Sequence, residues 1–422
     1  MRNRFPCGWQ KCMLKDIGNI VTGATPNSKH PEYYGKAYPF YKPTDLNAGY
    51  FVETSNNMIS EKGYEISRKL PAKSILVTCI GATIGKTGLI RCKGICNQQI
   101  NAIIPYKQII PEYVYFYIIS NDIQYQIKKN ASATTLPILN KSAFEKLKFL
   151  LPPLNEQRRI VEKIEEEFGK IDEGVGKLRF ALEQIKQYRQ AVLKSAFDGK
   201  LYKTTEWKEK TLGQILTPRR ERIIPNKHNG ELPFIGMDCI MPNSLKIHNS
   251  YKLKDTKSVA FVFYKNDVLY GRMRSYLNKV WQATFDGASS AEFIVFPENK
   301  QITSGFLKYL LHQQTFVKYA TRNASGDRPR VKFEADLAEY KIKLPKIDEQ
   351  NLIVEKIENA FSIVEDLNKI IRQNIDKAEQ LKQSILKKAF EGRLVPQDPN
   401  DEPASVLLEK IKAERKNKCL IS

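Results

Sequence analysis

An internal repeat is the feature that most constrains how this chain can fold. Residues 151–201 and 344–394 align without a gap at an offset of 193 positions, and about 20 of about 51 aligned residues are identical. Unrelated segments do not share so many residues over this length. The repeat extends beyond these segments, because the sequence NAS occurs at residues 130–132 and again at 323–325. The repeated unit is therefore a globular domain followed by a long helix.

Apolar residues in both aligned segments follow the spacing of a coiled-coil seam. They advance by alternating steps of four and three residues, which predicts a long helix with one apolar stripe. The seam positions are Ile164, Phe168, Ile171 and Leu178 in the first copy and Ile357, Phe361, Val364 and Ile371 in the second. Because one such helix alone would expose its stripe, we expect the two copies to form an antiparallel coiled coil. The alternative is that each helix packs only on its own globular neighbour.

Glycines mark weak points and ends of these predicted helices. Gly174 and Gly176 each cost about 1 kcal/mol of helix stability and would permit a bend in the first helix. Gly199 and Gly392 follow the sequences AFD and AFE, where a glycine that caps a helix C-terminus belongs.

The repeat divides the chain into five parts with an internal pseudo-twofold relationship. They are a first globular domain (1–150), a first spacer helix (151–201), a second globular domain (202–343), a second spacer helix (344–396) and a C-terminal tail (397–422). Both globular parts mix short runs of β-branched and aromatic residues with helical pieces. This mixture predicts an α+β fold class with small, curved β-sheets in each globular domain.

Positive charge is concentrated in the two globular domains. The chain has a formal net charge of +22, of which residues 1–150 carry about +11 and residues 202–343 about +10, while the helical parts are nearly neutral. A generally basic composition would not be distributed in this way. Two basic domains joined by a rigid spacer therefore indicate a protein that binds DNA at two places, such as the halves of a bipartite site.

Other signals in the sequence narrow the class of protein. No run of about 18 apolar residues is present, and the N-terminal sequence has no apolar signal-peptide core, so we expect a cytoplasmic protein that does not bind membranes. The seven cysteines and four histidines are not spaced as metal ligands, so we expect no metal site.

The stretch GATIGKT at residues 81–87 looks like the phosphate-binding loop of an ATPase. Its two glycines are separated by three residues, whereas that loop requires four so that backbone N–H groups can surround a phosphate. The repeat partner at residues 274–280 is RSYLNKV, which keeps the lysine and has no glycine. We therefore expect no nucleotide site and interpret both loops as edges that approach DNA.

Several polar and basic side chains near these loops are candidate DNA contacts. The two loops and their flanking residues contribute lysines and arginines, which are suited to phosphates. The amides just beyond the first loop are suited to adenine edges, and arginines are suited to guanine. The candidates are Lys86, Gln98, Gln99, Asn101, Thr134 and Thr135 in the first domain and Arg272, Arg274, Lys279, Arg328, Arg330 and Lys332 in the second. If residues 328–332 form a strand, the last three side chains share one face. The alternatives are a polar strand end for the amides and an exposed basic edge strand for residues 328–332.

The sequences LPPLNEQRRIVEKIE and LPKIDEQNLIVEKIE, which lead to AFDGKL and AFEGRL, carry a resemblance to a known family. Together with the tail GRLVPQDPNDEPASVLLEKIKAER, they resemble the specificity subunits of type I restriction-modification enzymes over the whole chain. The globular regions carry no such signal, because recognition domains in this family diverge with the DNA that they read.

The resemblance implies that each globular domain is a target-recognition domain that reads one half of a split DNA site. It implies two spacer helices that set the half-site distance and dock modification subunits, expected to be two, and it implies restriction subunits as further partners. The resemblance also implies that S-adenosylmethionine, ATP and Mg²⁺ belong to these partners and that this chain is not catalytic. A methyltransferase activity of this chain is disfavoured. The tetrapeptide that holds a flipped adenine has a polar first residue and an aromatic last residue, and LPPL at residues 151–154 has neither.

Two alternatives remain open at this point. One is a fused restriction-modification enzyme that methylates DNA by itself. The other is a helical scaffold whose basic domains bind RNA or acidic partners.

Overall fold

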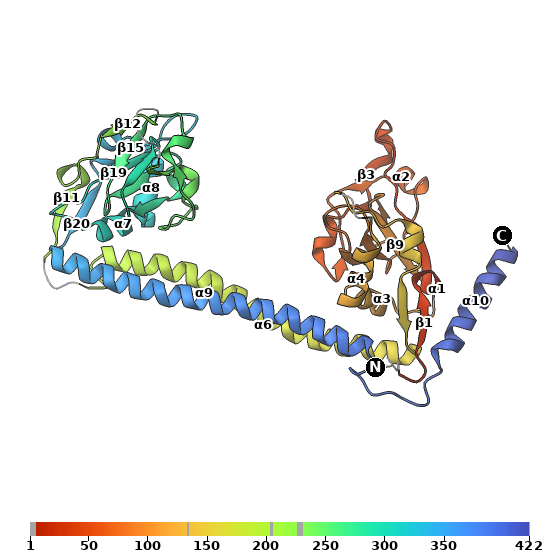
Figure 1. Ribbon diagram of the computed structural model, residues 1–422. Helices are drawn as coiled ribbons and strands as arrows, with labels where there is room; N and C mark the ends of the chain where they lie inside the picture. The colour runs from red at the N-terminus through yellow and green to blue at the C-terminus, as the bar shows by residue number, and fades with distance from the viewer. Residues whose placement is uncertain (1–5, 133–134, 203–205, 226–230, 422) are drawn as a thin grey trace. The chain divides into compact units, whose positions relative to one another are not determined.

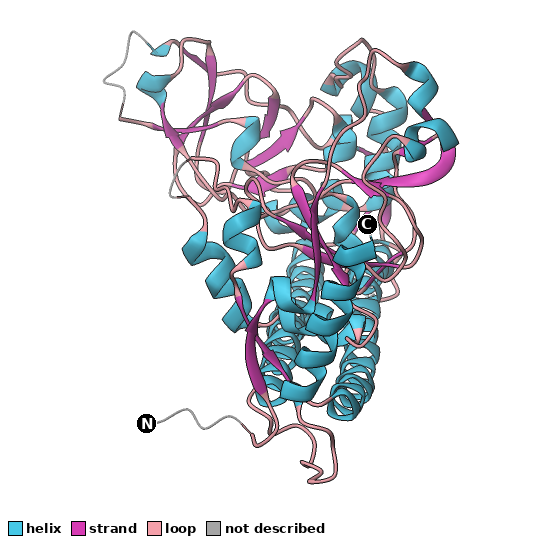
Figure 2. Cartoon of the chain, turned by 90° about the vertical axis from the view of Figure 1, so that its right-hand side faces the viewer, coloured by secondary structure: helices cyan, strands magenta, loops and turns pink. Residues whose placement is uncertain are grey.

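The computed structural model describes residues 6–132, 135–202, 206–225 and 231–421. The chain forms two compact units, Met1–Lys177 with Asn374–Ser422, and Leu178–Gln373. Each unit contains one globular domain together with parts of both long helices (Figure 1). The strands lie in the globular domains, whereas the long repeated segments are helical (Figure 2).

Domain 1, in the first unit, contains three small sheets. A five-stranded sheet has the order β2-β9-β6-β7-β4, a three-stranded sheet has the order β5-β3-β8, and β1 pairs with β10. Most pairs are antiparallel, and the pairs β4–β7 and β3–β8 are parallel. The strands are β1 (Gln10–Met13), β2 (Gly18–Thr22), β3 (Tyr34–Tyr41), β4 (Phe51–Val52), β5 (Met58–Ile59), β6 (Ile75–Thr78), β7 (Thr87–Ile90), β8 (Ile95–Cys96), β9 (Ile100–Pro105) and β10 (Lys148–Leu151).

Helices cover the five-stranded sheet of domain 1. Six of the eight residues of α3, from Tyr113 to Ile118, are buried, and this helix packs on β6 and β7. A helix that is apolar on all sides belongs inside a core. The helices of domain 1 are α1 (Leu14–Ile17), α2 (Glu61–Glu65), α3 (Pro111–Ile118), α4 (Asn121–Asn130) and α5 (Lys141–Glu145).

Domain 2, in the second unit, repeats this plan. Its sheets have the orders β12-β15-β18-β13-β14, β17-β16-β19 and β11-β20. The strands are β11 (Lys208–Thr211), β12 (Arg222–Ile223), β13 (Pro233–Ile235), β14 (Tyr251–Lys252), β15 (Ala260–Phe263), β16 (Val268–Gly271), β17 (Val280–Gln282), β18 (Gly287–Ser290), β19 (Phe293–Phe296) and β20 (Lys341–Leu344), and the helices are α7 (Ser304–His312), α8 (Gln314–Asn323) and a π-helix (Phe333–Leu337). The bounds of β16, α8 and β20 are those of β6, α4 and β10 shifted by 193 residues, so the sequence repeat is a structural repeat.

The two long helices are α6 (Leu154–Phe197) and α9 (Ile347–Phe390), each of 44 residues. Helix α6 is uninterrupted through Gly174 and Gly176. Gly199 and Gly392 follow the helix ends with φ angles of 73° and 70°, which confirms the predicted glycine caps. No helix within the described ranges is long and apolar enough to cross a membrane.

Within each unit, segments of α6 and α9 pack against each other in opposite directions. In the first unit, Lys382 Nζ lies 2.5 Å from Asp172 Oδ1 and 5.2 Å from the centre of the Phe168 ring. In the second unit, the Arg189 guanidinium lies 4.3 Å from the centre of the Phe361 ring. The predicted seam residues are buried (Ile164, Ile357, Phe361, Val364 and Ile371) or half-buried (Phe168, Ile171 and Leu178).

The same seam residues also contact the globular domains. Phe168 forms an edge contact with Phe116 of α3 at 5.7 Å, and Phe361 forms one with Tyr309 of α7 at 5.7 Å. Packing of the two helices on each other and packing of each helix on its own domain are therefore combined in this fold.

The C-terminal tail returns to domain 1 within the first unit. Helix α10 (Ala404–Ile421) buries Ala404, Leu407, Leu408 and Ile411 in the core of that unit. Ahead of it, Asp401 forms an ion pair with Arg159 at 2.6 Å. The tail is thus part of the packed core rather than an extension in solvent.

Candidate nucleic-acid interface

Two basic stretches of domain 2 that are far apart in the sequence meet in the structure. The loop 272–278 follows β16, and the turn 325–331 follows α8. Arg274 N–H donates to Pro329 O at 2.8 Å, and Val331 N–H donates to Arg272 O at 3.0 Å. We call the surface formed by these two segments the arginine surface.

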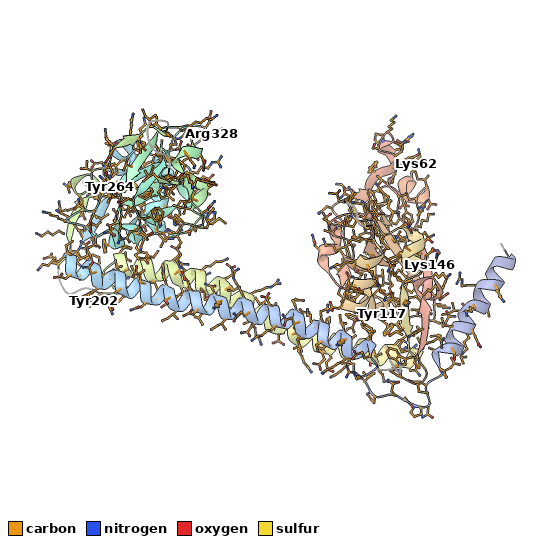
Figure 3. The ribbon with its side chains drawn as sticks, viewed as in Figure 1. Lys62, Tyr117, Lys146, Tyr202, Tyr264 and Arg328 are labelled. Carbon is orange, nitrogen blue, oxygen red and sulfur yellow. The ribbon has the colours of Figure 1, made fainter. Side chains whose placement is uncertain are left out.

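Two arginines of this surface are exposed to solvent. Arg274 lies in the loop and Arg328 in the turn, and neither forms an ion pair with any described part of the chain. Figure 3 shows Arg328 on the side of domain 2 away from the long helices, whereas Tyr202 lies beside them. Exposed guanidinium groups of this kind are suited to bind phosphates or base edges.

Arg330 has a different environment. Its Nε lies 2.9 Å from Glu292 Oε2, and its Nη2 lies 2.7 Å from Glu292 Oε1, so the two groups form a bidentate pair. Hydrogen bonds from Arg330 are the main cause that lowers the pKa of Glu292 below its usual value. Glu292 was not among the residues chosen from the sequence, although it aligns with the candidate Gln99 at the repeat offset of 193.

The expectation of a strand at residues 328–332 is wrong. Arg328 lies in a turn, Arg330 forms isolated bridges with Met273 and Ser325, and Lys332 precedes the π-helix with its N–H bonded to Asp336 Oδ2 at 2.6 Å. The three side chains therefore do not alternate along one strand, and Lys332 is placed by the start of a helix.

The loop after β16 and the GATIGKT loop after β6 have positive φ angles at the same two repeat positions. Arg274 and Asn278 have φ angles of 53° and 48°, and their repeat partners Gly81 and Gly85 have φ angles of 102° and 88°. A residue with a side chain is strained in this left-handed region, whereas glycine is not. The glycines of GATIGKT therefore serve the loop conformation, and in domain 2 an arginine adopts that conformation at a cost.

Domain 1 joins the equivalent two segments. Gly81 N–H donates to Pro137 O at 3.0 Å, and Leu139 N–H donates to Cys79 O at 2.8 Å. Thr135 is exposed beside this contact, and the candidate Thr134 lies outside the described residues. The sequence-predicted clusters are thus neighbours in both domains.

The two aligned lysines bond within their own domains. Lys86 Nζ donates to Pro43 O at 3.1 Å, and Lys279 Nζ donates to Met237 O at 2.6 Å. Lys279 is 9% exposed, and burial lowers the pKa of its ammonium group. Lys279 is therefore not presented at the surface, which corrects the expectation for this residue, and the half-buried Lys86 has the same anchoring bond.

The amide candidates of domain 1 separate into surface and core residues. Gln98 is exposed and accepts a hydrogen bond from Thr25 Oγ1 at 2.7 Å, and the half-buried Gln99 accepts one from Asn97 Nδ2 at 2.9 Å. Asn101 is 3% exposed in β9 and accepts from Thr22 Oγ1 at 2.7 Å. Asn101 therefore stabilises the sheet, and the expectation that it reads DNA is not compatible with its burial.

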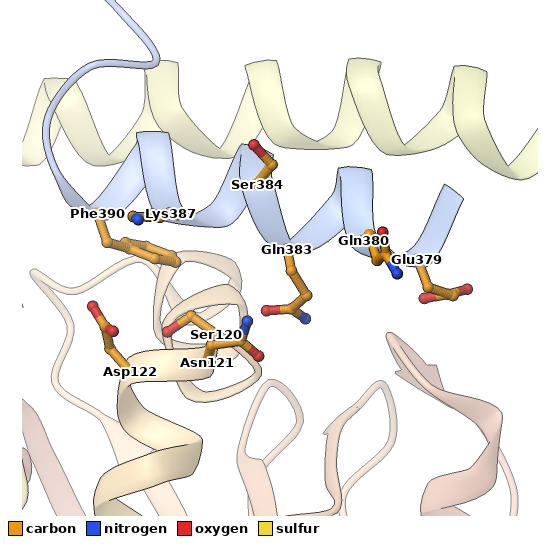
Figure 4. Close-up of a pocket in the computed structure, with 9 residues that line it drawn as sticks. All are labelled: Ser120, Asn121, Asp122, Glu379, Gln380, Gln383, Ser384, Lys387 and Phe390. Carbon is orange, nitrogen blue, oxygen red and sulfur yellow. The ribbon is translucent and has the colours of Figure 1, made fainter. Parts of the chain in front are cut away.

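A different kind of recess lies where domain 1 meets α9. Its lining includes Ser120, Asn121 and Asp122 around the start of α4, opposite Gln383 and Lys387 of α9 (Figure 4). Domain 2 has the equivalent recess, in which residues 313–315 face Gln190 and Lys194. Because the two recesses are related by the repeat offset, they belong to the shared scaffold. The described side chains contain no group of three or more His, Cys, Asp or Glu residues that could hold a metal ion.

Comparisons with known proteins agree with this architecture. The family described as type I restriction modification DNA specificity domain matches residues 6–173 and 204–377. The EcoDI type I restriction enzyme specificity subunit of Escherichia coli is 28% identical over 332 residues, which cover 69% of this chain and 74% of the relative. The StySPI specificity subunit of Salmonella potsdam is 22% identical, with 98% of this chain and 97% of the relative covered.

A solved structure has the same fold. It comes from work on complex assembly and conformational transition of the type I restriction-modification system, and its chain superposes with a TM-score of 0.74 at 18% identity. The match covers 93% of this chain and 100% of the solved chain.

Proposed function

Because the chain belongs to the family of type I restriction modification DNA specificity domains, we propose that its two domains each read one half of a bipartite DNA site. The chain is a specificity subunit, which acts by binding and has no catalytic role of its own. In domain 2, the reading surface is the arginine surface. In domain 1, it is the equivalent junction of residues 81–85 with residues 135–139, together with Gln98 and Gln99.

The observation that carries this proposal is the repeated junction in two basic domains. Each domain joins the loop after an inner strand to the segment after its second helix, and each domain carries an excess of about ten positive charges. Positive charge supplies affinity for the phosphate backbone, whereas side chains at the base edges supply specificity. The same framework with different side chains, Gly81 against Arg274 and Gln99 against Glu292, is suited to read two different half-sites.

The proposal extends to partners and cofactors. The paired helices α6 and α9 set the distance between the half-sites and dock two modification subunits, with restriction subunits joining the assembly. S-adenosylmethionine, ATP and Mg²⁺ are bound by those partner subunits. The complex works in the cytoplasm. No residue of this chain is assigned to any of these cofactors.

A band-shift experiment with competitor DNA tests the proposal. The chain is mixed with its modification partner and a pool of duplexes that have randomised sequence, and the bound fraction is sequenced. We expect enrichment of two short defined elements separated by a fixed number of unspecified bases. Retention of all duplexes equally, or methyl transfer by the purified chain alone, would contradict the proposal.

A further inference from the structure

Arg330 is held in place at its backbone and at its guanidinium group. Its backbone bridges Ser325, with N···O distances of 3.2 Å in both directions, and its guanidinium is bound by Glu292. The side chain is nevertheless 39% exposed, and that of Glu292 is 25% exposed. Arg330 is therefore a fixed group at the edge of the arginine surface, unlike Arg274 and Arg328.

We propose that Arg330 reads a guanine in the half-site of domain 2 and that Glu292 is its positioning residue. This proposal rests on the proposed function of the chain. Glu292 occupies Nε and Nη2 on one side of the guanidinium group. The outer edge of the guanidinium group, formed by Nη1 and the second N–H of Nη2, is not used by Glu292. Because the group is planar, the pair with Glu292 also fixes the plane of this outer edge. Two parallel N–H donors of this kind match the O6 and N7 acceptors of guanine in the major groove.

The carboxylate of Glu292 also distinguishes a base contact from a phosphate contact. A negative charge 2.7 to 3.1 Å from the guanidinium nitrogens offsets the charge of Arg330 and repels a phosphate. It does not remove the hydrogen-bond donors of the outer edge. Arg330 therefore adds little to sequence-independent attraction, while the exposed Arg274 and Arg328 are suited to the phosphates.

The position of Glu292 in the framework supports a role in specificity. Arg272 N–H donates to Glu292 O at 2.9 Å, and at the repeat offset Cys79 N–H donates to Gln99 O at 2.7 Å. The backbone at this position is thus the same in both domains, while the side chain changes from an amide to an acid. A position of this kind can alter the base that is read without altering the fold.

The test uses the full chain in complex with its modification subunits. The methylated sites are sequenced for the wild type, for Glu292→Gln and for Arg330→Lys, which keeps the charge and loses the planar fork. We expect both variants to lower the preference for guanine at the same single position of one half-site, on the order of tenfold. The other half-site should keep its sequence in both variants.

The matched control is Glu334→Gln. It removes the same charge from the exposed pair of Arg220 and Glu334 in the same domain, and it should leave the methylated sequence unchanged. An unchanged motif in both Glu292→Gln and Arg330→Lys, or an equal loss at every position of both half-sites, would overturn the assignment. If the wild-type complex itself shows no bipartite motif, the proposed function fails rather than this assignment.

Discussion

The indole Nε1 of Trp9 donates a hydrogen bond to Oε2 of Glu156 at 2.9 Å. The repeat has the same bond, from Trp207 Nε1 to Glu349 Oε1 at 3.0 Å. In both copies the tryptophan lies just before the first strand of the domain, and the glutamate lies in the first turn of the long helix. Burial is the largest influence on Glu156 and raises the pKa of its carboxyl group. This bond therefore fixes the beginning of each domain to the beginning of its helix.

We expect a measurable coupling between Trp207 and Glu349. The variant Trp207→Phe leaves a buried carboxylate without its indole donor, which should lower the free energy of unfolding by about 1–3 kcal/mol. Urea unfolding of Trp207→Phe, Glu349→Gln and the double variant forms a double-mutant cycle. If the two single changes add within about 0.5 kcal/mol, the bond does not contribute as we describe.

The strained backbone at Arg274 predicts opposite effects in the two domains. Arg274→Gly relieves the left-handed conformation, so the free energy of unfolding should stay equal or rise by about 1 kcal/mol, while DNA affinity falls because a cation is lost. Gly81→Ala has space for its methyl group, since the nearest atom outside its chain neighbours would be 3.7 Å away. The free energy of unfolding of this variant should nevertheless fall by about 1 kcal/mol, because a residue with a side chain is strained at the positive φ angle of this position. Thermal unfolding and a salt titration of DNA binding measure both effects, and a destabilised Arg274→Gly would refute this account of the loop.

The repeat made the architecture predictable, whereas the chemistry of individual side chains was not. Heptad spacing located Phe168 and Phe361, because burial on a helix follows a fixed period. The same spacing could not show that each ring also contacts its own domain at Phe116 or Tyr309. That contact depends on how α3 and α7 pack on the long helices, which is a tertiary property.

The candidate site shows the same limit at closer range. Proximity in the sequence suggested Asn101 and Lys279, but both lie inside their domains. Asn101 is in the fully buried first part of β9, where it accepts a hydrogen bond from Thr22, and Lys279 donates to the carbonyl oxygen of Met237. The pairing of Arg330 with Glu292 joins residues 38 positions apart, so no local pattern predicts it. The repeat offset was the one signal that could have identified Glu292, through its alignment with Gln99.

His312 should make the second unit sensitive to acid. It is 4% exposed at the end of α7, and burial lowers its pKa to about 3. The unfolded chain binds a proton near pH 6.5 and the folded chain does not, so stability is retained above pH 6.5 and falls as the pH decreases toward 3. The slope approaches about 1.4 kcal/mol per pH unit.

The variant His312→Gln checks this pH dependence. Between pH 6.5 and pH 4, the free energy of unfolding should decrease less for this variant than for the wild type. Urea unfolding at each pH measures the two decreases. The repeat partner is Ile119, which does not titrate, so hydrogen exchange should detect the acid effect in the second unit first. Equal pH profiles for the variant and the wild type would contradict the prediction.

Burial along the helices predicts graded effects of phenylalanine removal. Phe361 is 6% exposed, so Phe361→Ala should cost about 3–5 kcal/mol of unfolding free energy, and the half-buried Phe168 should cost less. Phe180 on α6 is 67% exposed and serves as the matched control, with an expected change within about 0.5 kcal/mol. Denaturant unfolding of the three variants gives the order, and a loss at Phe180 as large as that at Phe361 would contradict the described packing.

A domain exchange tests most directly whether the two domains read separate half-sites. Residues 202–343 are replaced by the corresponding domain of a relative, and methylated sites are sequenced in cells that carry the chain and its modification partner. We predict that one half-site changes completely while the other half-site and the spacer length are retained. A motif that stays unchanged, or that changes in both halves, would contradict the account.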